Sequence, residues 1–336
     1  MKKLHFLDKL IYLVNSILAI VLLLSYLLPF VSPKNIPFFA ILSLFAPLLI
    51  AINLVFVVYW LLRLKKQFLL STIILLLGWT FNSTFFKIVG KNNVENNDLS
   101  VMSYNVRMFN QWKWIENDSI PKKIADVIKR ENPDVLLLQE YYRIKNNPIK
   151  YPYQFINTKK DSGKIGLAIY SKFPIVNKGS LDLKNTANNI IFADIKRNKD
   201  TIRVYNLHLQ SLQLNTEKEN FGQENSEKLI ERLKTSFKKQ AEQTETFLAH
   251  QSSWKRKTIV AGDFNNTSYS WVYNQIASNK KDAFVKAGKG FGNTFNYWFP
   301  LRIDYILTDE TATIQSFKVI NEKNSDHYPI FSRLKW

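Results

Sequence analysis

Three long apolar runs occupy the first 87 residues of this 336-residue chain. Residues 10–31, 36–62 and 68–86 contain no Asp, Glu, Lys or Arg. A membrane-spanning helix needs about 20 predominantly apolar residues, so the pattern predicts three transmembrane helices, with residues 1–87 as a membrane anchor. The third run is the weakest, because polar residues lie near its end. The absence of charge within the runs favours an anchor over a transport path.

The basic residues that flank the apolar runs predict the orientation of the chain. Six of them lie before the first run or between the second and third, against three in the other two flanks. Basic flanks remain in the cytoplasm, so three spans place the rest of the chain outside. A cleaved signal peptide is disfavoured for the first run, which is too long and lacks a small-residue cleavage pattern. We therefore expect an integral protein of the plasma or inner membrane with its larger part on the non-cytoplasmic side.

The pattern of polarity changes after the third run. Residues 88–98 are polar and lack apolar periodicity, which is typical of a linker. From residue 99 to residue 336, short β-rich runs alternate with helical stretches, which predicts one mixed α/β domain. Helices are expected from Asp118 or Ser119 to just before Pro133, and over about residues 226–247. Strands are expected at Leu99–Val106, Val135–Gln139, Ile165–Ser171, Ile190–Ile195, Ile202–Leu207, Thr258–Ala261, Ile303–Leu307 and Tyr328–Arg333.

Composition narrows the classes of protein and of chemistry. A hydrophobic fraction of 46% excludes a disordered chain. The absence of cysteine excludes disulfides, a thiol nucleophile and cysteine-ligated metals. Residues 88–336 hold 38 of the 46 basic residues and 26 of the 27 acidic ones, a balance of about +12. That charge suits an anionic substrate or membrane surface, although a lysine-rich, solvated exterior accounts for it equally well.

Six short polar motifs lie at the ends of the predicted strands, where substrate sites of layered α/β proteins usually lie. An Asn or Asp after a strand is by default a turn residue, so each motif alone is weak evidence. Taken together, the six occur in one order, and they hold two of the four histidines in the chain. The motifs are Ser103-Tyr104-Asn105-Val106-Arg107, Leu138-Gln139-Glu140, Asn206-Leu207-His208-Leu209-Gln210, Gly262-Asp263-Phe264-Asn265, Arg302-Ile303-Asp304-Tyr305-Ile306 and Ser325-Asp326-His327-Tyr328-Pro329.

This ordered set resembles the endonuclease/exonuclease/phosphatase superfamily, and within it the deoxyribonuclease and neutral sphingomyelinase branches. The resemblance covers about residues 98–336 and leaves the apolar segment outside. It implies an α/β fold, a four-layer α/β/β/α sandwich in which two facing mixed β-sheets are flanked by helices. It also implies metal-dependent hydrolysis of a phosphate ester.

The resemblance implies the first set of site residues. Glu140, Asn105 and Asp326 match the divalent-metal region, and a set of hard oxygen ligands suits Mg²⁺, with Mn²⁺ as the alternative. His327 is expected to be the general base, because an unperturbed imidazole takes a proton from water near neutral pH. Asp304 is expected to orient His327 and to support its positive charge.

The remaining site residues are expected to act on the phosphate. Asp263 and Asn265 would hold the attacking water and a phosphate oxygen in line. His208 matches the deoxyribonuclease and sphingomyelinase branches, where a cationic imidazole stabilises the phosphorane or protonates the leaving group; in isolation it would be a hydrogen-bonded core residue. Its carboxylate partner is not evident, with Asp161 and Asp194 as candidates. The residues expected to contact the substrate are Asn105, His208 and Asn265.

We therefore predict a membrane-anchored, divalent-metal-dependent phosphoesterase, with a phosphodiester as the favoured substrate. Nucleic acid and a phospholipid head group are both open as substrates, and no protein partner is evident. The alternatives are a catalytically silent, membrane-tethered binding module, and a phosphomonoesterase or phosphoinositide phosphatase. The inositol phosphatase branch is disfavoured, because its aromatic-Cys-Asp-Arg-Ile cluster is replaced here by Arg302-Ile303-Asp304-Tyr305.

Overall fold

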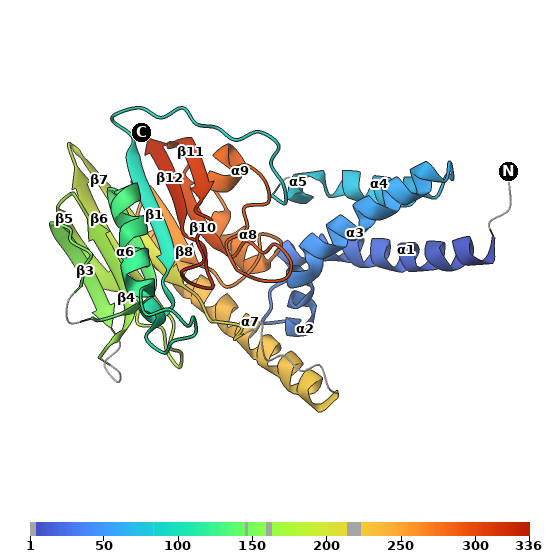
Figure 1. Cartoon of the computed structure of the whole chain (residues 1–336), viewed down its shortest axis with the longest axis horizontal. Helices are drawn as coiled ribbons and strands as arrows, with labels where there is room; N and C mark the ends of the chain where they lie inside the picture. The colour runs from blue at the N-terminus through green and yellow to red at the C-terminus, as the bar shows by residue number, and fades with distance from the viewer. Residues whose placement is uncertain (1–4, 83, 145–146, 159–162, 214–222) are drawn as a thin grey trace.

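The computed structural model describes residues 5–82, 84–144, 147–158, 163–213 and 223–336. A bundle of apolar helices lies against one side of a layered α/β domain, and the start of the first helix is the part of the bundle farthest from the sheets (Figure 1). The bundle contains α1 (Phe6–Ser25), a 3₁₀ turn (Leu28–Phe30), α2 (Pro37–Ala40), α3 (Leu42–Leu62), α4 (Phe68–Leu77) and α5 (Trp79–Asn82).

Two helices of the described part of the chain are long and apolar enough to cross a membrane, and the expected third is not. The two are Phe6–Phe30 and Leu42–Leu62. The third apolar run breaks at Gly78 into α4 and α5, so the prediction of three spanning helices is wrong in this respect. The break has a packing cause, because the Tyr26 ring lies against Gly78 so closely that a Cβ at Gly78 would lie 2.0 Å from a ring carbon.

A buried polar network joins the three longer helices of the bundle. The side-chain amide of Asn15 on α1 donates to the Ser71 hydroxyl on α4 (2.7 Å), and Ser71 donates to Asn53 on α3 (2.8 Å). The Trp60 indole N–H donates to Asn15 (3.0 Å). In apolar surroundings such bonds stabilise helix association, so the short α4 is held against both longer helices.

The α/β domain contains two six-stranded sheets with strand orders β11-β12-β1-β2-β4-β3 and β5-β6-β7-β8-β10-β9. All eight expected strands are present, and the four that the sequence did not predict, β3, β5, β9 and β11, are the edge strands. The strands are β1 (Leu99–Asn105), β2 (Val135–Tyr142), β3 (Tyr153–Thr158), β4 (Ile165–Ser171), β5 (Ile175–Ser180), β6 (Asn189–Arg197), β7 (Asp200–His208), β8 (Thr258–Asp263), β9 (Lys280–Asp282), β10 (Asp304–Asp309), β11 (Thr313–Val319) and β12 (Ile330–Lys335).

The two sheets face each other across one apolar core and carry helices on their outer faces, as expected. Alternate residues such as Val101 and Ile259 meet between the sheets. Helix α6 (Ile120–Glu131) packs its apolar side, including Ile124, on the outer face of the first sheet. Helices α7 (Gln223–Ser252) and α8 (Trp271–Ala277) cover the second sheet, through Phe247 and Ile276. The short helix α9 (Ala283–Ala287) lies beside β11.

Each sheet contains one parallel pair, β1 with β2 and β7 with β8. The carboxyl ends of parallel strands lie at the same edge of a sheet. Four of the six polar motifs lie at or near the carboxyl ends of these four strands, so the topology brings them to one end of the sandwich.

The helical bundle is fastened to the α/β domain beside that end. The Ser43 hydroxyl at the start of α3 donates to Asn266 (3.1 Å), and the Thr267 hydroxyl donates to the Ser43 carbonyl (2.8 Å). The expected linker also contacts the domain, because the Lys91 amide donates to the Ala287 carbonyl at the end of α9 and the Asn93 amide to the Gln315 carbonyl on β11. The bundle and the linker therefore contact the domain at several separate points, among them Ser43, Lys91 and Asn93.

Gly262 provides a test of how closely β7 and β8 pack. Its φ of +138° is a conformation that other residues rarely adopt, and a Cβ there would lie 2.0 Å from the Leu207 carbonyl oxygen. We expect Gly262→Ala to reduce the free energy of unfolding by about 3 kcal/mol, from backbone strain and overpacking together. Gly163→Ala, at a φ of +63° with open space around it, should cost only about 1 kcal/mol. Thermal unfolding in detergent checks both, and equal losses would contradict the packing argument.

Candidate active site

The structure brings every expected site residue to one end of the sandwich. Asn105 ends β1, Glu140 lies in β2, His208 ends β7 and Asp263 ends β8. The others precede or begin the strands that run back from this end, or lie in the loop after β8. They are Asn265, Asp304, Asp326 and His327.

Glu140 points into the site because of a β-bulge. The pairing of β2 with β4 shifts register between Leu138 and Tyr141, and Glu140 has a φ of +48°. A bulge redirects a side chain out of the strand alternation. The Asn105 amide then donates to the Glu140 carboxylate (3.3 Å) and to Asp263 Oδ2 (3.0 Å), so Asn105 joins the two sheets at the site.

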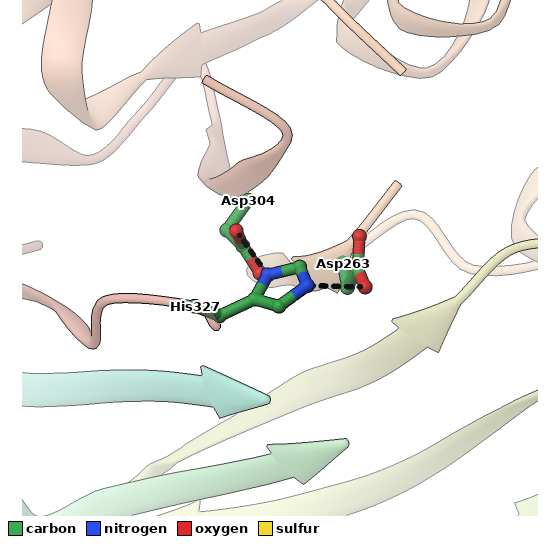
Figure 2. A group of neighbouring side chains, drawn as sticks. All are labelled: Asp263, Asp304 and His327. Carbon is green, nitrogen blue, oxygen red and sulfur yellow. Dashed lines mark hydrogen bonds and ion pairs between the residues drawn. The ribbon is translucent and has the colours of Figure 1, made fainter. Parts of the chain in front are cut away.

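Asp304, His327 and Asp263 form a buried row (Figure 2). His327 Nδ1 lies 2.9 Å from Asp304 Oδ2, and His327 Nε2 lies 3.7 Å from Asp263 Oδ2. Burial opposes the charge of the imidazole, but the Asp304 and Asp263 carboxylates together raise the pKa of His327 well above 6.5. The Thr294 hydroxyl accepts from the Asp304 amide (3.1 Å) and fixes the start of β10.

Asp263 is held by Asn265, two residues further along a turn in which Asn265 has a φ of +50°. The Asn265 backbone amide donates to Asp263 Oδ1 (2.8 Å), and its side-chain amide lies 3.2 Å from Oδ2. Burial, with a contribution from Asp304, raises the pKa of Asp263 to about 7, although His327 opposes the shift. The expectation of an unperturbed imidazole as general base therefore changes: the raised pKa of His327 favours its protonated form near neutral pH, whereas the facing Asp263 has a pKa of about 7.

His208 lies between two carboxylates that the sequence did not identify as its partners. Its Nε2 is 3.8 Å from Glu140 Oε1 and 3.7 Å from Asp263 Oδ2, and forms no hydrogen bond within the described residues. Burial and the charge of His327 lower the pKa of His208 to about 3, which favours the neutral imidazole over the cationic form that the resemblance implied. Of the two candidate partners, Asp194 pairs with Arg203 and Asp161 lies outside the described residues.

The oxygen atoms around Glu140 fit a divalent cation. Burial, followed by the charge of Asp326, raises the pKa of Glu140, so an added positive charge would stabilise this carboxylate. Asn105 presents its side-chain NH2 group to Glu140, and its side-chain carbonyl accepts from the Arg107 backbone amide (3.1 Å). A second buried group, Asp263, Asp304 and His327, has ligand atoms within 4.8 Å of one another, but Asp304 and His327 already bond to each other. The Glu140 side is thus the better match to hard-cation chemistry.

The sequence did not identify several residues that shape the site. The Arg107 guanidinium lies 3.3 Å from Asp326 and stacks over Trp114. The Ser325 hydroxyl donates to the Asn105 carbonyl (2.9 Å), which ties the loop before β12 to β1. Arg107 and Ser325 both belong to the polar motifs. Their position in these motifs is the feature of the sequence from which a place near the site could have been predicted.

A cavity of about 70 Å³ opens between Glu140, Asp263 and His327. A larger pocket of about 450 Å³, walled by amide side chains such as Asn188, lies on the other side of Glu140 and His208. Ser211 and Glu140 line both spaces. A group bound at Glu140 therefore has room on two sides.

Comparison with known proteins agrees with this geometry. Residues 102–327 match the model of the Endonuclease/Exonuclease/phosphatase family, and residues 8–85 match a model described only as a domain of unknown function. No curated protein sequence matches the chain significantly.

Several solved structures share the fold. An endonuclease/exonuclease/phosphatase family protein from Bacteroides thetaiotaomicron is 19% identical, with a TM-score of 0.53, over 72% of this chain and 98% of its own. A mannosyl-6-phosphatase from the same organism is 19% identical (TM-score 0.52; 71% and 100% covered). A humanized D. rerio TDP2 is 17% identical (TM-score 0.53; 71% and 99% covered). At these identities the likeness shows the fold alone.

Proposed function

We propose that this chain, which belongs to the endonuclease/exonuclease/phosphatase family, is a membrane-anchored phosphodiesterase that hydrolyses its substrate with a divalent cation and water. The observation that carries the proposal is the convergence of Glu140, Asp263 and His327 on one cavity. The two spaces on either side of Glu140 favour a phosphodiester, since each ester group of a diester needs room beside the phosphate.

Glu140 and Asp326 would hold the cation, and Asn105 would join them through the side-chain carbonyl that here accepts from the Arg107 amide. When bound, Mg²⁺ neutralises phosphate charge and lowers the pKa of a coordinated water. Asn105 keeps the Glu140 carboxylate and Asp263 in fixed positions through its two hydrogen bonds. Asp326 is positioned by Ser325 and Arg107.

The row of Asp304, His327 and Asp263 would move the proton of the attacking water. Asp304 orients the His327 ring and stabilises its positive charge. His327 and Asp263 face each other, so a proton taken up by Asp263 remains beside the imidazole. The neutral His208 would donate its Nε2 hydrogen to a phosphate oxygen, which supplies the hydrogen-bond partner that this buried nitrogen lacks within the described residues.

The arrangement of the bundle supports a catalytic domain on the side of the membrane opposite the amino terminus. The Arg63 guanidinium at the end of α3 pairs with Asp8 at the start of α1 (2.9 Å). The other ends of both helices contact the α/β domain, through Pro29 and Ser43. From the far end of α3 the chain returns toward the α/β domain through the short helices α4 and α5, and α4 packs against α3.

The first prediction is metal dependence. Full-length protein in detergent should hydrolyse bis(4-nitrophenyl) phosphate with Mg²⁺ or Mn²⁺ and lose the activity in excess chelator. Glu140→Gln should raise the Mg²⁺ concentration for half-maximal rate by about tenfold or more, because a ligand charge is lost. The exposed Glu116→Gln is the control and should behave as wild type. Full activity in chelator would exclude the proposed chemistry.

The second prediction concerns Asp304 and His327. His327→Ala should lower kcat by about 10²–10⁴-fold, and Asp304→Asn should also be severe. The double variant should lose far less than the product of the two effects, because the residues act as a unit. His250→Ala, outside the site, serves as the control. Multiplicative losses in steady-state kinetics would show that the pair shares no role.

The third prediction is topological. The chain lacks cysteine, so single cysteines can be placed at Lys199, in the exposed turn between β6 and β7, and at Gln67, between α3 and α4. A membrane-impermeant maleimide on intact cells with a permeabilised outer envelope should label the Lys199→Cys variant. The Gln67→Cys variant should be labelled only after lysis of the inner membrane. The reverse pattern would place the active site in the cytoplasm.

A further inference from the structure

One of the residues lining the catalytic cavity belongs to the helical bundle, and the others belong to the α/β domain. Leu44, in the first turn of α3, lines the cavity together with Leu212, Phe295, Leu301 and Ile303. The other lining residues include the carboxylates of Glu140, Asp263 and Asp326, and His327. We call the five apolar residues the apolar wall of the cavity.

The apolar wall is firmly placed. The hydrogen bonds of Ser43 with Asn266 and Thr267 fix the turn that carries Leu44. Leu44 also packs with Leu212 and Phe237 in an apolar cluster between the bundle and α7. The neighbouring Asn265 is a site residue, so the contact between bundle and domain continues directly into the site.

A loop of aromatic residues extends the apolar wall away from the cavity. Phe295 contacts the His327 ring (5.0 Å between centroids), and Tyr297 stacks on Phe295. Trp298 follows with 71% of its surface exposed. At the start of the same loop Phe291 packs on Phe86, directly after the helical bundle. Exposed tryptophans beside apolar helices are typical of a membrane–water interface.

We propose that the catalytic cavity accepts the phosphate of a membrane lipid, with the first carbons of its apolar part against Leu44 and the other members of this wall. The inference rests on the proposed phosphodiesterase function and names its substrate class. A site for the phosphate of nucleic acid would place lysine or arginine beside the ester group. Apart from His327, none of the described residues lining this cavity is basic, and Lys239 lines only the adjoining pocket. An amphiphile in the bilayer reaches the cavity along α3 and the Trp298 loop.

Alkylphosphonates test the wall, because each carries one apolar group on a phosphate-like head. We expect hexylphosphonate to inhibit hydrolysis of bis(4-nitrophenyl) phosphate by the full-length protein at least about tenfold more tightly than methylphosphonate, since each buried methylene contributes about fourfold. Leu44→Ala should reduce that ratio at least about threefold. Leu54→Ala, on an exposed part of the same helix, should preserve it.

Leu212→Ala provides a second variant on the α/β side of the wall and should reduce the ratio as Leu44→Ala does, so the inference remains testable if one variant fails to fold. A ratio near one in the wild type, or a ratio unchanged in both wall variants, would overturn the inference and leave the proposed function intact. No hydrolysis of the diester with Mg²⁺ would reject the proposed function and this inference with it.

Direct competition between substrates gives an independent result. Phospholipid vesicles and single-stranded DNA, each with Mg²⁺, should be offered to the full-length protein at equal phosphate concentration. Faster hydrolysis of the lipid is expected. Faster hydrolysis of the DNA would overturn the inference in favour of a nuclease.

Discussion

The hydrogen bond from the Asn105 amide to Asp263 (3.0 Å) is the contact on which the arrangement of the site depends. Asn105 belongs to one sheet and Asp263 to the other, so the bond fixes the separation of the two sheets where the chemistry is expected. A second buried amide supports it from within the sandwich, because Asn206 on β7 donates to the carbonyls of Leu138 and Ala168 in the facing sheet. A polar bond inside an apolar core has few alternative partners, so these amides set the register in which the sheets can pack.

That register concentrates charge in a place with little water. Glu140, Asp263 and Asp304 are brought together with two histidines, and burial raises the pKa of two of the carboxyls. An uncompensated cluster of this kind opposes folding, and the extensive apolar core between the sheets offsets its cost. Because the buried negative charges destabilise one another, binding a cation or a proton in this cluster is favoured. Stability and reactivity are thus in opposition at one end of the sandwich, as is common at functional sites.

The burial of each strand explains whether the sequence predicted it. The eight predicted strands are flanked on both sides by other strands, and their apolar runs reflect that position; the four edge strands, such as β5 with exposed residues along it, lack this signal. The site residues followed strands in recognisable motifs and could be predicted. The break at Gly78 and the approach of Leu44 to the site could not, because each depends on contacts between segments far apart in the chain. The pKa of His327 likewise depends on Asp263, which only the fold brings beside it.

The segment between the bundle and β1 has the sequence of a linker between two domains, but in the structure it packs against the α/β domain. Its amides bond to β11, an edge strand, and the bundle covers Leu212, Phe237 and Tyr269. An excised α/β domain would expose this apolar surface together with an unpaired strand edge, the two features that promote aggregation. It would also lose Leu44 from the lining of its own cavity. The smallest unit that retains a complete site is therefore the whole polypeptide, and an enzyme freed from its helices would differ in selectivity as well as in solubility.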